Sequence, residues 1–471
     1  MRGPLNDAVT GALWLDQLDP FPSRRERLSG DLSCDVAIVG GGYSGLWTAW
    51  YLRRLDPTIR IQVIEKHHCG FGASGRNGGW AVGELAGSFE KYAKRSNDDE
   101  ALRQARAVFD AVDEIGRVTQ DAGIDCDYRK GGWIRLARNR PQADRMREEI
   151  EHEHRRGFGE DELRLLEPDE ARNFLNATRV EAGVYFAPCA ALHPAKLVAG
   201  LAAHLEADGV AIAEGTEVES IVTGPLGANK IVTDRGTVSA EVVVRATEAY
   251  TRDLEGMKLD LLPVYSLMVA TEPLPADVFD EIGLADRPTF SDDRFMVIYG
   301  QRTADDRLAF GGRGVPYLFG SRIASSAELH EPSHELLRET LFEMLPILRE
   351  RDVGFTHRWG GVLGIPRNWT PGLRYDRQWG YGQLGGYVGE GVAAANLAGR
   401  TMAELIAGEQ TERTSLPWVG VRSRSWEPEP LRWIGVRASR RILAGADDRE
   451  YETDEPAGWQ FRLSRLLRGG N

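Results

Sequence analysis

The sequence predicts an α/β protein, α+β over its whole length, in which a strand–helix–strand unit is interleaved with an antiparallel sheet. Three observations lead to this prediction. An apolar run at 36–39 ends in a glycine-rich turn that opens a helical segment, which is the order of a parallel βαβ unit. The block 262–357 instead contains short alternating strands and one helix, as antiparallel sheets do. The 471 residues suffice for two or three domains.

The first strand leads directly into the pattern G-x-G-x-x-G, formed by Gly40, Gly42 and Gly45. We expect the helix that follows at 43–55. Glycines at these positions allow a tight turn, a close approach of a pyrophosphate and close packing of the helix on the sheet. The N-terminal amides and the dipole of the helix then favour phosphate groups. The turn therefore predicts a dinucleotide site.

A second strand at 60–65 ends in Glu65, 20 residues after Gly45, where an acceptor for a ribose hydroxyl is expected. The acid favours an unphosphorylated ribose, as in NAD or FAD. A second glycine-rich loop follows at 70–79, with Ser74, Arg76 and Asn77 as polar donors. Because this loop can hold a longer cofactor along its length, it favours FAD, and an NAD dehydrogenase is the least favoured alternative.

These motifs, in this order, resemble the flavin-dependent amine oxidoreductases that include D-amino acid oxidase, glycine oxidase, monomeric sarcosine oxidase and gamma-glutamylputrescine oxidase. The likeness extends to about Gly408. It implies a Rossmann-like FAD-binding domain interleaved with an antiparallel-sheet substrate domain. The expected boundaries are an N-terminal arm at 1–33, the FAD-binding domain at 34–80, 191–250 and 356–410, the substrate domain at 81–190 and 251–355, and a Trp- and Arg-rich extension at 411–471.

The resemblance also implies which residues hold FAD. Val218 is expected near the adenine, the turn at 246–250 is expected to approach the cofactor with Glu248 where the family often has Asn, and the glycine-rich turn at 385–391 is expected over the flavin. The expected cofactor-binding residues are Gly40, Gly42, Tyr43, Ser44, Gly45, Glu65, Lys66, Gly72, Ala73, Ser74, Arg76, Asn77, Gly78, Gly79, Val218, Ala246, Thr247, Gly361, Gly386, Tyr387, Gly389, Gly391 and Val392.

Some family members attach the flavin through a cysteine between a W-G-G and a T-P motif. The corresponding segment here, 362–369, contains no cysteine, and none follows Cys189. We therefore expect non-covalent FAD.

On the substrate side, the resemblance implies oxidation of the carbon–nitrogen bond of an amine or amino acid to an imine, with no dedicated general base. Arg313 and Arg358 are candidates to hold a substrate carboxylate. The aromatic candidates Trp80, Tyr265 and Trp359 could form a wall for an amine, or could be core residues. His357 is a further candidate, whereas His193 is expected to cap a helix.

We expect oxygen to accept the electrons. A dehydrogenase that passes them to a quinone or a protein partner is one alternative, and an FAD-binding subunit without turnover is another. The aromatic and basic segment 431–443 bears on this choice, since it could be an amphipathic helix on a membrane or partner, or a tail packed on the body of the protein.

The net charge of −13 argues against nucleic acid or an anionic membrane as the main partner. No stretch approaches the roughly 20 apolar residues of a membrane helix, and the first residues do not resemble a signal peptide, so we expect a cytoplasmic protein. The four cysteines are scattered, and the neighbouring side chains of His67, His68 and Cys69 point in different directions. We therefore expect neither disulfides nor a metal site.

Overall fold

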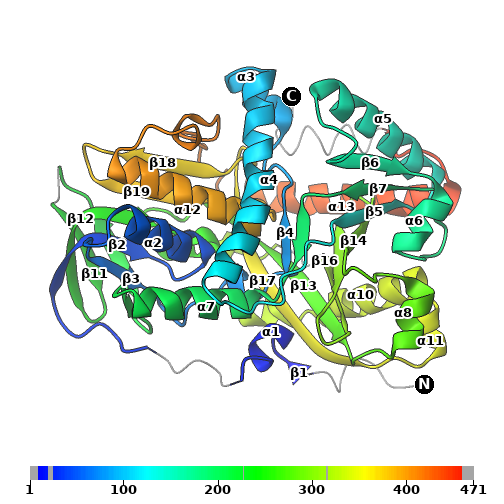
Figure 1. Cartoon of the computed structure of the whole chain (residues 1–471), viewed down its shortest axis with the longest axis horizontal. Coiled ribbons are helices and arrows are strands. Elements are labelled where there is room, and N and C mark those ends of the chain that lie inside the picture. Colours follow the sequence, from blue (N-terminus) through cyan, green and yellow to red (C-terminus); the bar gives the residue numbers. More distant parts are fainter. Residues whose placement is uncertain (1–8, 20–24, 226–227, 315–316, 459–471) are drawn as a thin grey trace.

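The computed structural model describes residues 9–19, 25–225, 228–314 and 317–458. Two large sheets form the framework, and helices cover both of them (Figure 1). The predicted mixed α/β fold is confirmed. The chain passes between the two sheets several times. The predicted domain boundaries stay a prediction.

The first sheet has eight strands and contains the predicted βαβ unit. Four neighbouring strands, β12, β2, β3 and β9, are parallel, and β19 is parallel to β12. The order is β10 (Val218–Val222), β11 (Asn229–Thr233), β12 (Gly236–Arg245), β2 (Leu32–Val39), β3 (Ile61–Ile64) and β9 (Ala211–Ala213), with β19 (Tyr381–Gly385) beside β12 and β18 (Gly372–Asp376) beside β19.

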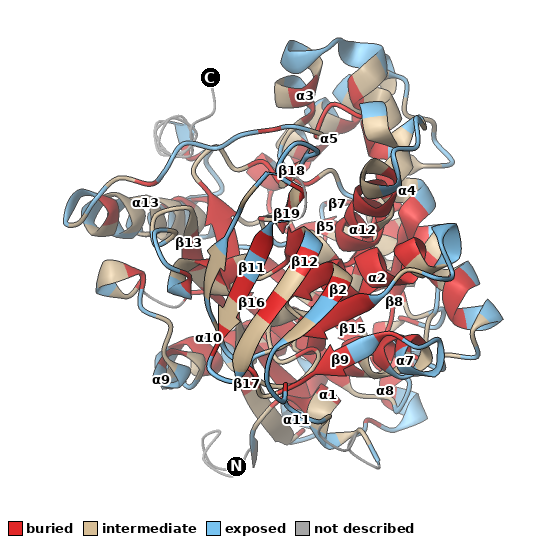
Figure 2. Ribbon diagram, turned by 90° about the vertical axis from the view of Figure 1, so that its left-hand side faces the viewer, coloured by how far each residue is buried: buried red, intermediate tan, exposed pale blue. Residues whose placement is uncertain are grey.

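Helices α2 (Tyr43–Leu55), α7 (Pro194–Ala207) and α12 (Gly391–Ala407) pack on this sheet. Figure 2 shows α2 and α12 as largely buried helices beside β2. The two helices approach so closely that a Cβ added to Gly399 of α12 would lie 2.6 Å from the Cβ of Trp47 in α2. The predicted helix at 43–55 is confirmed. His193 caps α7, since its Nδ1 accepts a hydrogen bond from the Lys196 amide at 3.1 Å, as predicted.

The second sheet has nine strands and is antiparallel except at the pairs β1–β17 and β14–β5. Strand β17 pairs with β13 here, although it begins the last segment assigned to the FAD-binding domain. The order is β1 (Val9–Thr10), β17 (Phe355–Pro366), β13 (Leu261–Thr271), β16 (Leu308–Arg313), β15 (Ile298–Arg302), β14 (Thr289–Asp292), β5 (Trp133–Ala137), β7 (Ala182–Phe186) and β6 (Leu163–Leu166).

Strand β15 begins only at Ile298. The backbone N–H groups of Phe295 and Met296 donate to the carboxylate of Asp447 instead of to a neighbouring strand, at 2.7 and 2.8 Å.

The remaining elements connect and cover the sheets. The longest of these helices are α4, α5 and α10 in the body of the protein and α13 in the extension. The full set is α1 (Leu13–Asp16), η2 (Ala73–Gly75), β4 (Trp80–Val82) paired with β8 (Cys189–Ala191), α3 (Phe89–Arg95), α4 (Asp98–Asp121), α5 (Arg140–Arg156), α6 (Pro168–Phe174), η3 (Glu248–Asp253), α8 (Ala276–Ile282), η4 (Phe319–Ser321), α9 (Ser325–Glu328), α10 (Glu331–Met344), α11 (Ile347–Glu350), η5 (Arg413–Ser415) and α13 (Leu431–Thr453).

Both ends of the described chain pack on its body. Trp14 of the N-terminal arm is buried, and its indole N–H donates to the carbonyl of Asn77 at 2.8 Å. Trp426 of the extension is buried, and its indole N–H donates to the carbonyl of Ile365 at 2.7 Å. The described part of the extension is therefore a packed tail, while Trp459 lies outside the described residues. No helix among the described residues is long and apolar enough to cross a membrane.

Candidate functional site

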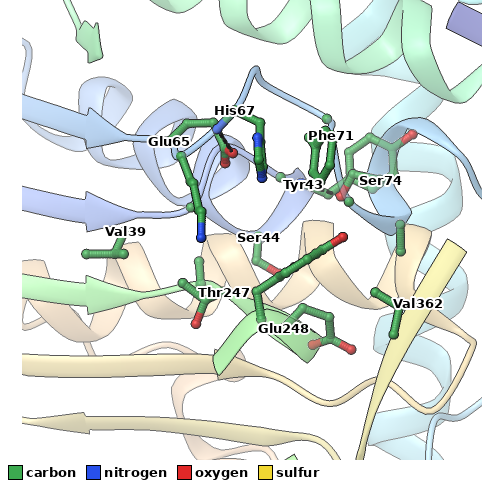
Figure 3. Close-up of a pocket in the computed structure, with 18 of the residues that line it drawn as sticks. Val39, Tyr43, Ser44, Glu65, His67, Phe71, Ser74, Thr247, Glu248 and Val362 are labelled. Atoms are coloured by element: carbon green, nitrogen blue, oxygen red, sulfur yellow. Dashed lines mark hydrogen bonds between the residues drawn. The ribbon is translucent and has the colours of Figure 1, made fainter. Parts of the chain in front are cut away.

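A cavity of about 1280 Å³ lies where β2 and β3 end and α2 begins (Figure 3). This is the edge of a parallel sheet at which ligands bind in open α/β folds. Its walls come from segments far apart in the sequence, within 39–44, 64–77, 216–218, 246–254, 362–363 and 387–395.

The glycine-rich turn at this cavity has no space for side chains. Gly40 has a φ of +112°, and a Cβ on it would lie 2.5 Å from the carbonyl oxygen of Ala246. A Cβ on Gly45 would lie 2.1 Å from the carbonyl oxygen of Gly40. The turn therefore brings bare backbone and the positive end of the α2 dipole to the cavity, as a pyrophosphate requires.

Glu65 lies at the end of β3, facing the cavity (Figure 3). Its Oε2 accepts a hydrogen bond from the Gly41 amide and its Oε1 accepts one from the His67 amide, both at 2.8 Å. Burial raises the pKa of this carboxyl group, which the two amide donors oppose. The carboxylate is thus fixed in place with lone pairs left to accept ribose hydroxyls.

The model of the FAD-dependent oxidoreductase family matches residues 35–405. The chain belongs to this family. The oxidoreductase is 30% identical to the gamma-glutamylputrescine oxidoreductase of Escherichia coli, over 82% of this chain and 86% of that protein. It is 29% identical to the probable oxidoreductase OrdL of Haemophilus influenzae, over 81% of this chain and 84% of that protein. The sequence-based resemblance and the expected FAD cofactor are confirmed.

A solved structure shares the fold. The glycine oxidase of Geobacillus kaustophilus superposes with a TM-score of 0.68 at 21% identity, covering 83% of this chain and 99% of that one. The geometry of the turn and of Glu65 makes this the cavity in which FAD is expected, and it will be called the FAD cavity.

Most residues expected to contact FAD line this cavity, although their contacts with the cofactor stay predictions. Gly45, Gly79 and Gly386 line neither this cavity nor a second, adjoining one, and they lie instead where the backbone turns leave little space for a Cβ. Arg76, Gly78 and Gly361 line that second cavity. Those in the wall of the FAD cavity are Gly40, Gly42, Tyr43, Ser44, Glu65, Lys66, Gly72, Ala73, Ser74, Asn77, Val218, Ala246, Thr247, Tyr387, Gly389, Gly391 and Val392.

Arg76 has a different environment from the one expected. Its guanidinium pairs with Glu328 of α9 at 2.7 Å and lies over the ring of Phe71, 4.7 Å from the centroid. The second glycine-rich loop is therefore tied to the nine-stranded sheet side of the molecule through this ion pair.

Glu248 is a site residue whose role the sequence did not show. Its Oε2 accepts a hydrogen bond from the Gly386 amide at 2.6 Å and its Oε1 accepts one from the Gly364 amide at 3.2 Å. Figure 3 shows it across the cavity from Glu65. Burial raises the pKa of Glu248 to about 7. One carboxyl group thus joins the turn after β12, strand β17 and the last glycine-rich turn.

The second cavity, of about 1220 Å³, adjoins the FAD cavity and will be called the substrate cavity. The two share Ala73, Asn77, Leu363, Gly389 and Val392 as wall residues. Three aromatic side chains of the substrate cavity lie close together. The ring centroids of Trp80 and Trp133 are 5.7 Å apart, and those of Trp80 and Tyr299 are 6.0 Å apart. Trp80 was a predicted substrate-side residue, and the other two were not.

Carboxylates outnumber guanidiniums in the substrate cavity. Its described wall carries four carboxylates, at Glu84, Asp292, Asp293 and Glu390, against three guanidiniums, at Arg76, Arg135 and Arg294. All three arginines are paired, Arg76 with Glu328. The Nε of Arg294 donates to Asp292 at 2.8 Å, and Arg135 pairs with Glu149 at 2.8 Å and with Asp293 at 3.6 Å.

Four predicted substrate-side residues line neither cavity. His357 contacts Asp16 at 3.1 Å, and the carbonyl of Arg358 accepts a hydrogen bond from the Gly11 amide. Trp359 is buried and donates to the carbonyl of Arg76 at 2.9 Å, while the Tyr265 hydroxyl bonds the backbone of Ala324. The start of β17 is unavailable because the N-terminal arm covers it. The side chain of Arg313 lies outside the described part of the structure.

Proposed function

We propose that the oxidoreductase oxidises the carbon–nitrogen bond of an amine, giving an imine that water then hydrolyses. The observation that supports this most directly is the aromatic, carboxylate-rich cavity that shares walls with the FAD cavity. FAD, when bound, supplies the hydride acceptor. The relative in Escherichia coli is named for gamma-glutamylputrescine and the structural neighbour for glycine, and both substrates contain such a bond.

The chain's own residues would bind and orient the amine. The faces of Trp80, Trp133 and Tyr299 attract a cationic nitrogen and exclude water. The excess of carboxylates favours a substrate that carries positive charge. A substrate that depends on its carboxylate would need an unpaired guanidinium, and the three arginines of the described wall, Arg76, Arg135 and Arg294, are already paired. We therefore propose an amine with a second cationic group rather than a simple amino acid.

Anaerobic flavin reduction tests this proposal. We expect diamines and N-alkylated diamines to bleach the flavin absorbance at lower concentration than amino acids of similar size. The variant Asp293→Asn should raise the amine concentration for half-maximal bleaching several-fold, while the exposed control Asp286→Asn should leave it unchanged. Bleaching by amino acids alone would contradict the assignment of an amine, and a flavin that no amine reduces would favour the subunit without turnover.

We further propose oxygen as the electron acceptor. Relatives and structural neighbours include dehydrogenases as well as oxidases by name, so a quinone or protein acceptor is the second candidate. Admitting air to the bleached protein separates the two, because an oxidase reoxidises within seconds and forms peroxide. The described walls of the two cavities contain no cysteine, which supports non-covalent FAD. The four cysteines are free thiols, which supports a cytoplasmic location.

A further inference from the structure

A third cavity, of about 830 Å³, lies behind the last glycine-rich turn, on the side away from FAD. Gly385 belongs to its wall, and a Cβ on Gly385 would lie 2.6 Å from the Glu248 carboxylate, which faces the FAD cavity. The rest of the wall comes from the end of β12, from β18 and β19, from residues 421–423 of the extension, and from residues 251, 260–261, 366 and 370. The two cavities are therefore separated by a single turn of the chain.

Three guanidiniums meet in this cavity. Arg245, Arg374 and Arg422 line it, and Asp260 is the one carboxylate in the described wall. The Nη1 of Arg245 is 3.3 Å from Asp260. Arg374 and Arg422 form no ion pair with any carboxylate in the part of the chain that the structure describes. The wall thus has two more positive charges than negative ones.

The guanidiniums of Arg245 and Arg374 are held by the uncharged side chain of Gln383. The Oε1 of Gln383 accepts hydrogen bonds from Arg245 at 3.1 Å and from Arg374 at 2.8 Å. The Nε of Arg374 is buried without a hydrogen-bond partner among the described residues. Burial, and next the charges of Arg422 and Arg245, lower the pKa of Arg374. The guanidiniums therefore repel one another, and the Nε of Arg374 has no acceptor among the described residues. Both effects lower the stability of the folded protein unless a bound ligand supplies negative charge and an acceptor.

We propose that this cavity binds a phosphate-type dianion, either free or as the phosphate group of a small ester. Guanidiniums bind phosphate with two parallel hydrogen bonds each, and two negative charges match the excess of the wall. Thr251, Thr370 and Ser423 also line the cavity, although the hydroxyls of Thr370 and Ser423 donate to the backbone carbonyls of Asn368 and Arg424. Arg422 and Ser423 lie beyond the segment 35–405 that matches the family model, whereas Arg245 and Arg374 lie within it.

Calorimetric titration of the FAD-loaded protein tests the site, because bound FAD keeps phosphate out of the pyrophosphate position. We expect inorganic phosphate to bind with a Kd below about 1 mM at constant ionic strength, and sulfate to compete with it. Arg422→Gln and Arg374→Gln should each weaken binding at least about tenfold. The matched control is Arg424→Gln, an exposed arginine of the same segment outside the cavity.

Two results would overturn the proposal: no binding up to about 20 mM phosphate, or equal affinity in all three variants. Arg422 is exposed, so its variant decides the question even if Arg374→Gln folds poorly. A phosphate ester that binds more tightly than inorganic phosphate would identify the ester as the source of the dianion, and equal affinities would identify free phosphate. None of these measurements depends on which amine the enzyme oxidises.

Discussion

The carboxylate of Asp447, in helix α13 of the extension, accepts a hydrogen bond from the backbone N–H of Phe295 at 2.7 Å. Its second oxygen accepts one from Met296 at 2.8 Å. The loop held in this way carries Asp293, Arg294 and Val297 into the wall of the substrate cavity. The extension, which lies beyond the family match, thus holds a loop that forms part of the wall of the substrate cavity.

Removing this carboxylate should therefore affect substrate binding. In Asp447→Ala we expect the KM for the amine to rise about 5- to 20-fold, which corresponds to the loss of one or two hydrogen bonds, while FAD content stays normal. Asp448→Ala is the control, because Asp448 is the exposed neighbour of Asp447 on the same helix. Steady-state kinetics with absorbance-based FAD quantification would decide, and an unchanged KM would rule out a positioning role.

The raised pKa of Glu248, about 7, predicts a pH-dependent stability. The folded protein binds this proton more tightly than the unfolded chain, whose carboxyl has a pKa near 4.3. The free energy of unfolding should therefore fall as pH rises from about 4.5 through 7. Glu248→Gln cannot lose a proton, so its Tm relative to the wild type should increase between pH 5 and pH 8.

Exposed Glu241→Gln provides the baseline for that comparison. Other groups that titrate over the same range cancel in the difference between wild type and variant. A difference in Tm that does not vary with pH would show that Glu248 is ionised in the folded protein across this range.

FAD retention tests the role of Glu65. Removing its carboxylate in Glu65→Ala deletes the acceptor expected for the ribose and the partner of the Gly41 and His67 amides. We expect FAD affinity to fall about 10- to 100-fold, or 1.4 to 2.7 kcal/mol. Gly42→Val should have a similar effect, because a Cβ there would already lie 2.9 Å from the Ser74 hydroxyl oxygen. Normal FAD content in both purified variants would contradict the site.

A pair of glycine variants separates backbone geometry from helix propensity. Gly45→Ala places its Cβ 2.1 Å from the Gly40 carbonyl oxygen, so we expect destabilisation by about 2 to 4 kcal/mol and loss of FAD. Gly435→Ala in α13 has nothing within 4 Å of the new Cβ. It should stabilise the helix by up to about 1 kcal/mol. Denaturant unfolding of both variants checks the expected opposite signs.

The FAD cavity was predictable because its main parts are local. The glycine turn, the helix at 43–55 and Glu65 follow one another within 26 residues, from Gly40 to Glu65, and each has its own sequence signal. Steric limits on the turn and the dipole of the helix act at short range, so the residue types reveal them directly.

The substrate cavity was not predictable in the same way. Arg135 and Asp292 meet there because β5 and β14 pair in parallel, with Ile134 opposite Phe290. No local pattern encodes a pairing between strands more than 150 residues apart. The placement of His357 and Arg358 outside both cavities was not predictable for a related reason, since the strand that pairs with them is formed by the N-terminal arm.

The sheet order also determines when the oxidoreductase can first take up its cofactor. The glycine turn is synthesised early, but the opposite wall of the FAD cavity includes Val392, 347 residues after Gly45. At about 5 to 20 residues per second, a ribosome needs roughly 20 to 70 s to cover that distance. For most of its synthesis, the nascent chain therefore has the glycine turn but lacks the opposite wall of the FAD cavity. FAD can be bound stably only once the last sixth of the protein is being synthesised.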